Sequence, residues 1–336
     1  MYIILHVQYY QFGLKIFRSP VCKKSNMAQY SQWPKVELAS NDILTIKDPS
    51  GNIIELFPCY GYYFPRSSIE KRRYPDPREN IPSIIKMKTR HDDVFLTAYP
   101  KTGTHWLTEI LYMLLNKRLE YNKEYGKVSA MLPLQTPEMV DKLPSPRILN
   151  SHLLLSSLPR DILTQKNKVV FVNRNPKDVA VSLYHFCKHT INYEGSWNDF
   201  LQLFMSEKGM VYAGPWHKYM MDWDNVIRNN SKLDVLVVNY EDLKMNPLKE
   251  IERLAEYLDV KSSSDFYSQV SERCRFNQLK DDYKNRNHPL REVIFRKGDV
   301  GDWKNWFTVA QNEEFDKHLT EKLTNSSWTF RYCVKE

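Results

Sequence analysis

Short apolar runs that alternate with stretches of helical spacing are the feature that most constrains this chain. The first run is Val94–Ala98, and apolar residues at helical spacing begin at Leu107. Three further runs follow: Arg147–His152, Lys168–Asn173 and Asp234–Tyr240. Strands that alternate with helices are typical of parallel βαβ units in one sheet covered on both faces. The pattern predicts a single α/β domain with a central parallel sheet flanked by helices.

Two helices are expected directly after strands of this sheet, over Pro176–Phe186 and Pro247–Leu258. The Pro- and Arg-rich stretch Phe64–Pro82 is expected to be loop with short irregular pieces, because proline and turn residues interrupt both helices and strands. Internal repeats and low-complexity segments are absent from the sequence.

The first 30 residues are expected to be a disordered extension that precedes a domain over residues 31–336. Polar side chains such as His6, Gln8, Gln11 and Lys15 interrupt their apolar content, whereas a membrane span needs about 20 mostly apolar residues. A basic start and a small-residue cleavage site are also missing, which disfavours a secretory signal. Translation from Met27 and a membrane anchor remain the alternatives for this segment.

The cysteine pattern and the net charge indicate the cellular compartment and the class of partner. The five cysteines are scattered and form no C-x-x-C pair, which favours reduced thiols in the cytoplasm. No Cys/His cluster has the spacing of a zinc site, so no metal is expected. The formal net charge of +8 favours an anionic partner such as nucleic acid, an acidic membrane or a phosphorylated small molecule, and does not by itself choose among them. The sequence has no long basic tract and no nucleic-acid-binding motif, which disfavours nucleic acid.

The loop Lys101-Thr102-Gly103-Thr104 lies between the first strand and the helix that follows it. Gly103 permits close backbone approach, the threonines offer hydroxyl groups, and a helix N-terminus directs free N–H groups at an anion. The loop therefore predicts a phosphate site. It lacks the G-x-x-x-x-G-K-[ST] pattern of nucleotide kinases and NTPases. The alternative is an ordinary strand–helix turn capped by threonine.

Four segments in the same order resemble the cytosolic sulfotransferase family. Tyr99–Trp106 is similar to the family's 5′-phosphosulfate loop, YPK[ST]GT-x-W, and Arg174–Ser182 to its 3′-phosphate motif. Tyr240–Lys244 is similar to its YED segment, and Phe295–Lys304 to its RKG…GDWK signature. The resemblance implies a P-loop-NTPase-like topology. It also implies transfer of a sulfuryl group from 3′-phosphoadenosine 5′-phosphosulfate (PAPS), with adenosine 3′,5′-bisphosphate (PAP) as product.

The same resemblance implies roles for individual residues. His152 is expected to be the general base, and Lys101 to stabilise the bridging oxygen of the leaving group. Asn150 and Phe186 are expected near the acceptor. The nucleotide is expected to bind Lys101, Thr102, Gly103, Thr104, His105, Trp106, Arg174, Ser182, Tyr240, Cys274, Phe276, Arg296, Lys297 and Gly298. Taken singly, His152 and Tyr240 would be structural residues and Arg174 a surface ion pair.

Three positions depart from the usual form of the family. His105 stands where a second threonine usually touches the phosphate. Asn150 stands where many members carry a lysine that steadies the sulfonate, and an amide supplies no charge. Cys274 replaces a more usual threonine near the adenine. These departures leave the expected base and the loop lysine in place.

A segment near the C-terminus fits the family's short dimerisation pattern, KxxxTVxxxE, through Lys304, Thr308, Val309 and Glu313. The resemblance therefore implies a homodimer formed through a small patch. The alternative is a surface loop that leads into a capped helix, because Thr308 also suits the start of a helix.

The expected acceptor is a small hydroxylated or amine compound. The walls of its pocket are expected to come from residues 60–64, 131–143 and 276–295 together with His185 and Phe186. Several Tyr and Phe residues in these stretches favour phenols and catecholamines over steroids and other alcohols. Three other functions compete with this one. They are a nucleotide-binding regulator without catalysis, a membrane-anchored sulfotransferase of the Golgi type, and a nucleotide kinase.

Overall fold

The computed structural model describes residues 43–70, 74–123, 126–207, 212–286 and 290–333. By its contacts the chain divides into two units, Met1–Trp33 and Pro34–Glu336. The first unit, and with it the expected extension over residues 1–30, lies outside the described residues. Within the described ranges, no helix has the length and apolar character needed to cross a membrane.

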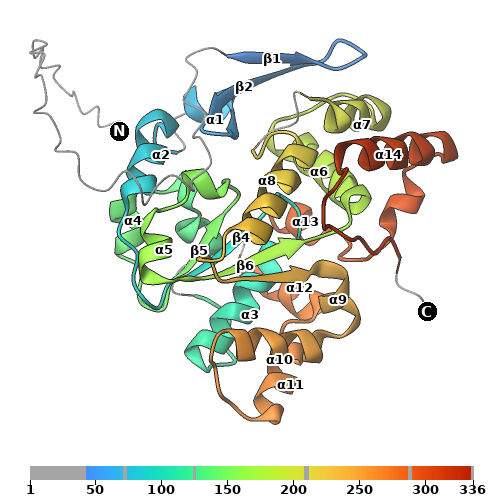
Figure 1. Ribbon diagram of the computed structural model, residues 1–336. Coiled ribbons are helices and arrows are strands. Elements are labelled where there is room, and N and C mark those ends of the chain that lie inside the picture. The colour runs from blue at the N-terminus through green and yellow to red at the C-terminus, as the bar shows by residue number, and fades with distance from the viewer. Residues whose placement is uncertain (1–42, 71–73, 124–125, 208–211, 287–289, 334–336) are drawn as a thin grey trace, which may run out of the picture. The chain divides into compact units, whose positions relative to one another are not determined.

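A four-stranded parallel sheet forms the centre of the second unit (Figure 1). Its strands are β4 (Val94–Ala98), β5 (Ile148–Ser151), β6 (Lys168–Asn173) and β7 (Val235–Asn239), in the order β5-β4-β6-β7. Each strand agrees with an apolar run of the sequence to within one residue at either end. The prediction of a parallel sheet is confirmed.

Alternate residues of the strands pack on opposite faces of the sheet, as the period of two requires. On one face, Leu96 and Val170 pack in one apolar cluster with residues of α3 (Thr104–Asn116) and α10 (Pro247–Tyr257). On the other face, the ring of Phe171 lies 5.0 Å from that of Trp223 in α8 (Trp216–Asn229). Figure 1 shows α3 and α10 on one side of the sheet and α8 on the other. The fold is therefore an α/β fold with P-loop-NTPase-like topology.

The expectation of a loop over Phe64–Pro82 is wrong in part. Strand β3 (Tyr62–Pro65) ends in this stretch, and helix α2 (Pro77–Lys86) begins in it. Proline is well suited to the first helical position of α2 because its fixed φ is already helical there. The Asp76 side chain accepts a hydrogen bond from the Arg78 backbone N–H and caps the helix.

A second, antiparallel sheet precedes the parallel one and was not predicted. It consists of β1 (Leu44–Lys47), β2 (Ile53–Cys59) and β3 in that order. The remaining helices are α1 (Arg66–Glu70), α4 (Pro137–Asp141), α5 (Asp161–Gln165), α6 (Pro176–Thr190), α7 (Trp197–Met205), α9 (Tyr240–Met245), α11 (Ser264–Arg273), α12 (Phe276–Asn285), α13 (Arg291–Ile294) and α14 (Val309–Lys322).

Candidate active site at the carboxyl edge of the sheet

The loop between β4 and α3 has the backbone of an anion cradle. Lys101 and Gly103 both have positive φ, 72° and 101°. Gly103 is the N-cap of α3 and has no side chain that could cap the helix, and a helix N-terminus of this kind suits an anionic ligand. A Cβ atom at Gly103 would lie 2.7 Å from Cδ2 of Tyr240. Glycine is therefore required here both by backbone conformation and by space.

The Lys101 side chain reaches from this loop into a cavity without meeting a carboxylate. Its ammonium group lies 4.3 Å from the centre of the Phe186 ring and 3.5 Å from the carbonyl oxygen of Val293. Burial, reinforced by the positive charges of Lys127 and Arg174, lowers the pKa of Lys101 to about 7. An anion in the cavity would reverse this shift, because an opposite charge favours the ammonium form.

His152 follows the last residue of β5 and is held in one tautomer. Its Nδ1 atom lies 2.6 Å from the carbonyl oxygen of Ala98, and because a carbonyl only accepts, Nδ1 carries the proton. In the neutral ring Nε2 is then free to accept a proton. Burial and the nearby charge of Lys127 hold the pKa of His152 well below its usual range, so the ring is neutral.

Arg174 joins the phosphate loop to the C-terminal segment. Its guanidinium group donates to the carbonyl oxygens of Lys101, at 3.0 Å, and Asp299, at 3.3 Å. It also lies over the ring of Tyr240, 4.2 Å from its centre. The buried Nε of Arg174 has no hydrogen-bond partner among the described residues. An unsatisfied guanidinium N–H beside an empty volume is well matched to a phosphate oxygen.

The RKG segment closes the same side of the cavity. Arg296 and Lys297 form ion pairs with Asp302, at 2.6 Å and 2.5 Å. Gly298 packs so tightly that a Cβ there would lie 2.1 Å from the Phe276 ring, and its carbonyl accepts a hydrogen bond from the Tyr240 hydroxyl. Both basic side chains thus lie near the cavity but are held by a carboxylate in this structure.

His105 and Trp106, in the first turn of α3, also border the cavity. The Nδ1 atom of His105 lies 3.3 Å from the hydroxyl oxygen of Tyr283, and this contact holds the ring. The Trp106 ring contacts that of Tyr240 edge-on, with the centres 5.6 Å apart. Its buried indole N–H has no hydrogen-bond partner in the described part of the chain. Such a surface of aromatic rings suits a planar base.

The cavity encloses about 440 Å³, within the range that small-molecule sites occupy. Basic side chains from several elements border it, whereas Asp299 is the single acidic residue among the described residues that line it. The basic residues are Lys101, Lys127, Arg174, Lys244, Arg296 and Lys297. Such a site favours an anionic ligand, because the cations Lys101 and Lys127, unpaired among the described residues, gain a partner when the ligand binds. No group of three or more metal-ligating side chains is found in the described ranges.

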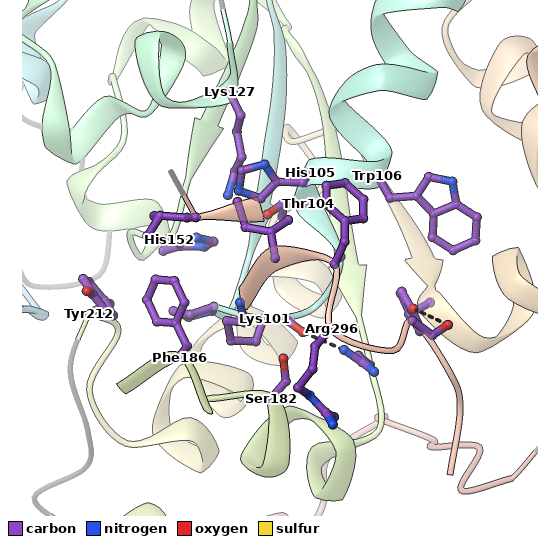
Figure 2. Close-up of a pocket in the computed structure, with 18 of the residues that line it drawn as sticks. Lys101, Thr104, His105, Trp106, Lys127, His152, Ser182, Phe186, Tyr212 and Arg296 are labelled. Atoms are coloured by element: carbon purple, nitrogen blue, oxygen red, sulfur yellow. Dashed lines mark hydrogen bonds between the residues drawn. The ribbon is translucent and has the colours of Figure 1, made fainter. Parts of the chain in front are cut away.

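Most of the residues singled out from the sequence meet around this cavity (Figure 2). Those that border it are Lys101, Gly103, Thr104, His105, Trp106, His152, Arg174, Ser182, Phe186, Tyr240, Phe276, Arg296, Lys297 and Gly298.

Three singled-out residues do not border the cavity. The Thr102 hydroxyl donates to the carbonyl of Tyr99, and the buried Cys274 thiol packs 3.8 Å from the sulfur of Met113. Asn150 is fully buried, with its amide bonded to Thr108 and to the Ile148 carbonyl.

Lys127 is a buried basic residue of the cavity that sequence reasoning missed. It begins a 3₁₀ turn, Lys127–Ala130, and its side chain is buried and borders the cavity near His152 (Figure 2). No motif covers this turn. A lysine between exposed neighbours gives no local signal that it points inward.

Comparison with known proteins agrees with this geometry. The sulfotransferase domain family matches residues 91–327. Sulfotransferase 1A1 of Mus musculus is 36% identical over 259 residues, which cover 71% of this chain and 87% of the relative. The solved structure of mouse sulfotransferase SULT7A1 complexed with PAP is 29% identical, with a TM-score of 0.66, and the match covers 81% of this chain and 96% of that one.

A more distant structure shows the same fold. Retinol dehydratase, solved in complex with androsterone and PAP, is 19% identical with a TM-score of 0.64, and the match covers 86% of this chain and 92% of the other.

Proposed function

The chain belongs to the sulfotransferase family and is a PAPS-dependent transferase, and we propose that it sulfates a hydroxyl or amine group of a small acceptor with His152 as the general base. PAPS supplies an already activated sulfuryl group. The protein therefore has to bind and orient PAPS and the acceptor, and to take one proton from the acceptor. The observation that carries the proposal is the shared cavity of His152 and the Lys101 loop. A neutral base with a free Nε2 lies there beside a helix N-terminus built for an anion.

The nucleotide is proposed to bind along the basic and aromatic side of the cavity. The Nε of Arg174 and the indole N–H of Trp106 offer hydrogen bonds that no group of the described residues accepts. Trp106, Tyr240 and Phe276 offer ring surfaces to the adenine. Arg296 and Lys297 would turn from Asp302 towards the 3′-phosphate, whose greater charge competes with a single carboxylate.

Catalysis is proposed to depend on positioning and electrostatics, as in phosphoryl transfer. Nε2 of His152 accepts the acceptor's proton. The Lys101 ammonium group stabilises the oxygen that bridges phosphorus and sulfur as that oxygen becomes the leaving group. The low pKa of free His152 does not weaken this role, because bound phosphate and sulfuryl charges raise it again.

The acceptor is proposed to be a planar, phenol-like molecule. Beyond His152 the cavity is bordered by Tyr62, Phe186 and Tyr212 together with Met131 and Leu134. The Phe186 and Tyr212 rings meet edge-on, with centres 5.6 Å apart. Aromatic rings favour edge or offset contacts with a further flat ring, and methionine adapts to irregular shapes.

The domain is proposed to span residues 31–336 and to act in the cytoplasm as a homodimer. Free thiols at Cys59, Cys187, Cys274 and Cys333 support a reducing compartment. Val309 supports the dimer because it is 77% exposed at the start of α14. Thr308 caps that helix reciprocally with Gln311, so the alternative of a capped surface helix is also in keeping with the geometry.

Incubation of the purified protein with radiolabelled PAPS and a panel of phenols, catecholamines, steroids and alcohols tests activity and acceptor class together. Label transfer to phenols ahead of the other classes is expected. Calorimetric titration with PAP tests the nucleotide site separately. A protein that does not bind PAP would contradict the assignment of the cavity, whereas PAP binding without any label transfer would favour a nucleotide-binding regulator.

A further inference from the structure

Lys127 occupies a fixed position beside the expected base. The 3₁₀ turn that it begins leads into Met131, which pairs with Asn150 of β5 in a parallel bridge. Two residues after Asn150 comes His152, so this pairing places the turn next to the base. The side chain of Lys127 is 9% exposed and borders the cavity, whereas those of Val128 and Ser129 in the same turn are exposed.

The ammonium group of Lys127 has no hydrogen bond or ion pair with any residue that the structure describes. Other deeply buried cations of this protein are partnered: Arg147 pairs with Asp93 at 2.5 Å, and Lys177 with Asp316 at 2.6 Å. Burying an unpaired ammonium group is costly, and burial lowers the pKa of Lys127 to about 7. A lysine kept in such a place is suited to an anion that arrives with the substrates.

The position of Lys127 indicates which anionic group of the substrates it would contact. Its charge lowers the pKa of both Lys101 and His152, so it lies within electrostatic reach of the loop lysine and of the base. In Figure 2, Lys127 and Lys101 enter the cavity from opposite sides, and His152 is drawn between them, whereas Ser182 and Arg296 lie beyond Lys101. Lys127 is thus placed at the reacting end of the site and away from the 3′-phosphate residues.

We propose that Lys127 is a catalytic residue whose ammonium group contacts the non-bridging oxygens of the sulfuryl group during its transfer. This inference rests on the proposed function. In the step, the acceptor oxygen forms a bond to sulfur, and its proton goes to Nε2 of His152. The bond between sulfur and the bridging oxygen breaks, and its electron pair stays on that oxygen, so PAP leaves. Charge on the transferred group is stabilised by a fixed cation that needs no reorganisation.

Substitution Lys127→Met tests the proposal, because it keeps the length of the side chain and removes the charge. Turnover of PAPS with 4-nitrophenol is expected to fall ~100-fold, the scale for removing one transition-state partner. PAP has no sulfuryl group, so its dissociation constant, measured by calorimetry, is expected to stay unchanged. Lys127→Arg is expected to recover part of the turnover. Lys123→Met, which changes an exposed lysine four residues earlier, is the matched control.

Wild-type turnover in Lys127→Met would overturn the proposal. So would a change confined to the KM of the acceptor, since Lys127 would then recognise the acceptor instead. Loss of PAP binding in both Lys127→Met and Lys127→Gln would make Lys127 a structural residue and would also overturn it. Failure of the wild-type protein to bind PAP is a different result, because it contradicts the proposed function itself.

Discussion

The Nδ1 atom of His152 donates a 2.6 Å hydrogen bond to the carbonyl oxygen of Ala98, the last residue of β4. The base is thereby tied to the strand that leads into the phosphate loop. Both residues face the same carboxyl edge of the sheet, where open α/β sheets place their ligands. One backbone atom therefore sets the tautomer of the imidazole and its position relative to Lys101.

His152→Ala is expected to abolish measurable turnover and to leave PAP binding nearly intact. The imidazole takes a proton in the proposed step, and general base catalysis contributes about 10²–10⁴-fold, whereas the nucleotide is held by other residues. Steady-state assays with PAPS and calorimetry with PAP measure the two effects. His91→Ala, at an exposed histidine before β4, is the control. Near-normal turnover in His152→Ala would remove this residue from the mechanism.

Lys101→Ala is expected to lower turnover by ~100-fold or more, because it deletes the cation placed at the leaving oxygen. Single-turnover assays with PAPS isolate this effect from product release. Lys123→Ala removes an exposed lysine outside the cavity and is expected to behave as the wild type. A loss smaller than ~10-fold would count against a transition-state role for Lys101.

The parallel sheet is largely predictable from the sequence, whereas the antiparallel sheet is not. Strands β4 and β6 are covered on both faces, so most of their residues are apolar and the runs are easily recognised in the sequence. In β2, exposed and buried residues alternate along Ile53–Leu56, which is a weaker signal. Helix α2 was missed because Pro77 and Pro82 suggested a loop, although Pro77 lies where proline favours a helix.

Site residues were predictable where they belong to a contiguous motif. In the loop from Lys101 to Trp106 and in the segment around Arg174, the functional residues are neighbours in the sequence. Lys127 does not, because its inward direction comes from a pairing between Met131 and Asn150 that no local pattern encodes. The sequence also does not show to which face of the sheet the Asn150 side chain points, since a shift of one residue along a strand reverses that face.

PAP affinity is expected to fall as the pH rises above about 7. In the free protein burial lowers the pKa of Lys101 to about 7, so at pH 8 most of this side chain is neutral. A bound phosphate favours the ammonium form and raises the pKa, so binding takes up protons. The ligand's own phosphates, with a second pKa of about 6, are already ionised at this pH.

Calorimetry at pH 8 in two buffers of different ionisation enthalpy measures this proton uptake directly. The uptake is expected to be smaller in Lys101→Met and unchanged in Lys123→Met. A PAP affinity that stays constant between pH 7 and pH 9 would show that Lys101 is already charged in the free protein.

Val309→Glu is expected to convert a dimer into a monomer at micromolar concentration. An exposed valine at the start of α14 contributes to a small interface only through apolar contact, and a carboxylate there would face its own symmetry mate. Sedimentation velocity measures the change. Ile53→Glu is the control, because Ile53 is also exposed, at 58%, but lies in β2. A wild-type protein that sediments only as a monomer would contradict the proposed homodimer.

Gly103→Ala is expected to destabilise the fold and to weaken PAP binding together. An alanine at φ near +101° is strained by about 1–2 kcal/mol. Its Cβ would also force Tyr240 to move, and Tyr240 holds both the Arg174 guanidinium and the Gly298 carbonyl. The added methyl group therefore disturbs the nucleotide side of the cavity as well as the loop.

Gly51→Ala separates these two causes. Gly51 has a comparable φ of 89°, but a Cβ there would have no neighbour within 4 Å. The Gly51→Ala variant is expected to lose about 1–2 kcal/mol of its free energy of unfolding through backbone strain alone. Its affinity for PAP is expected to stay unchanged. Urea unfolding and calorimetry measure the two quantities in each variant. If Gly103→Ala and Gly51→Ala lost equal stability and both bound PAP normally, the close packing of Tyr240 against Gly103 would have no part in forming the nucleotide site.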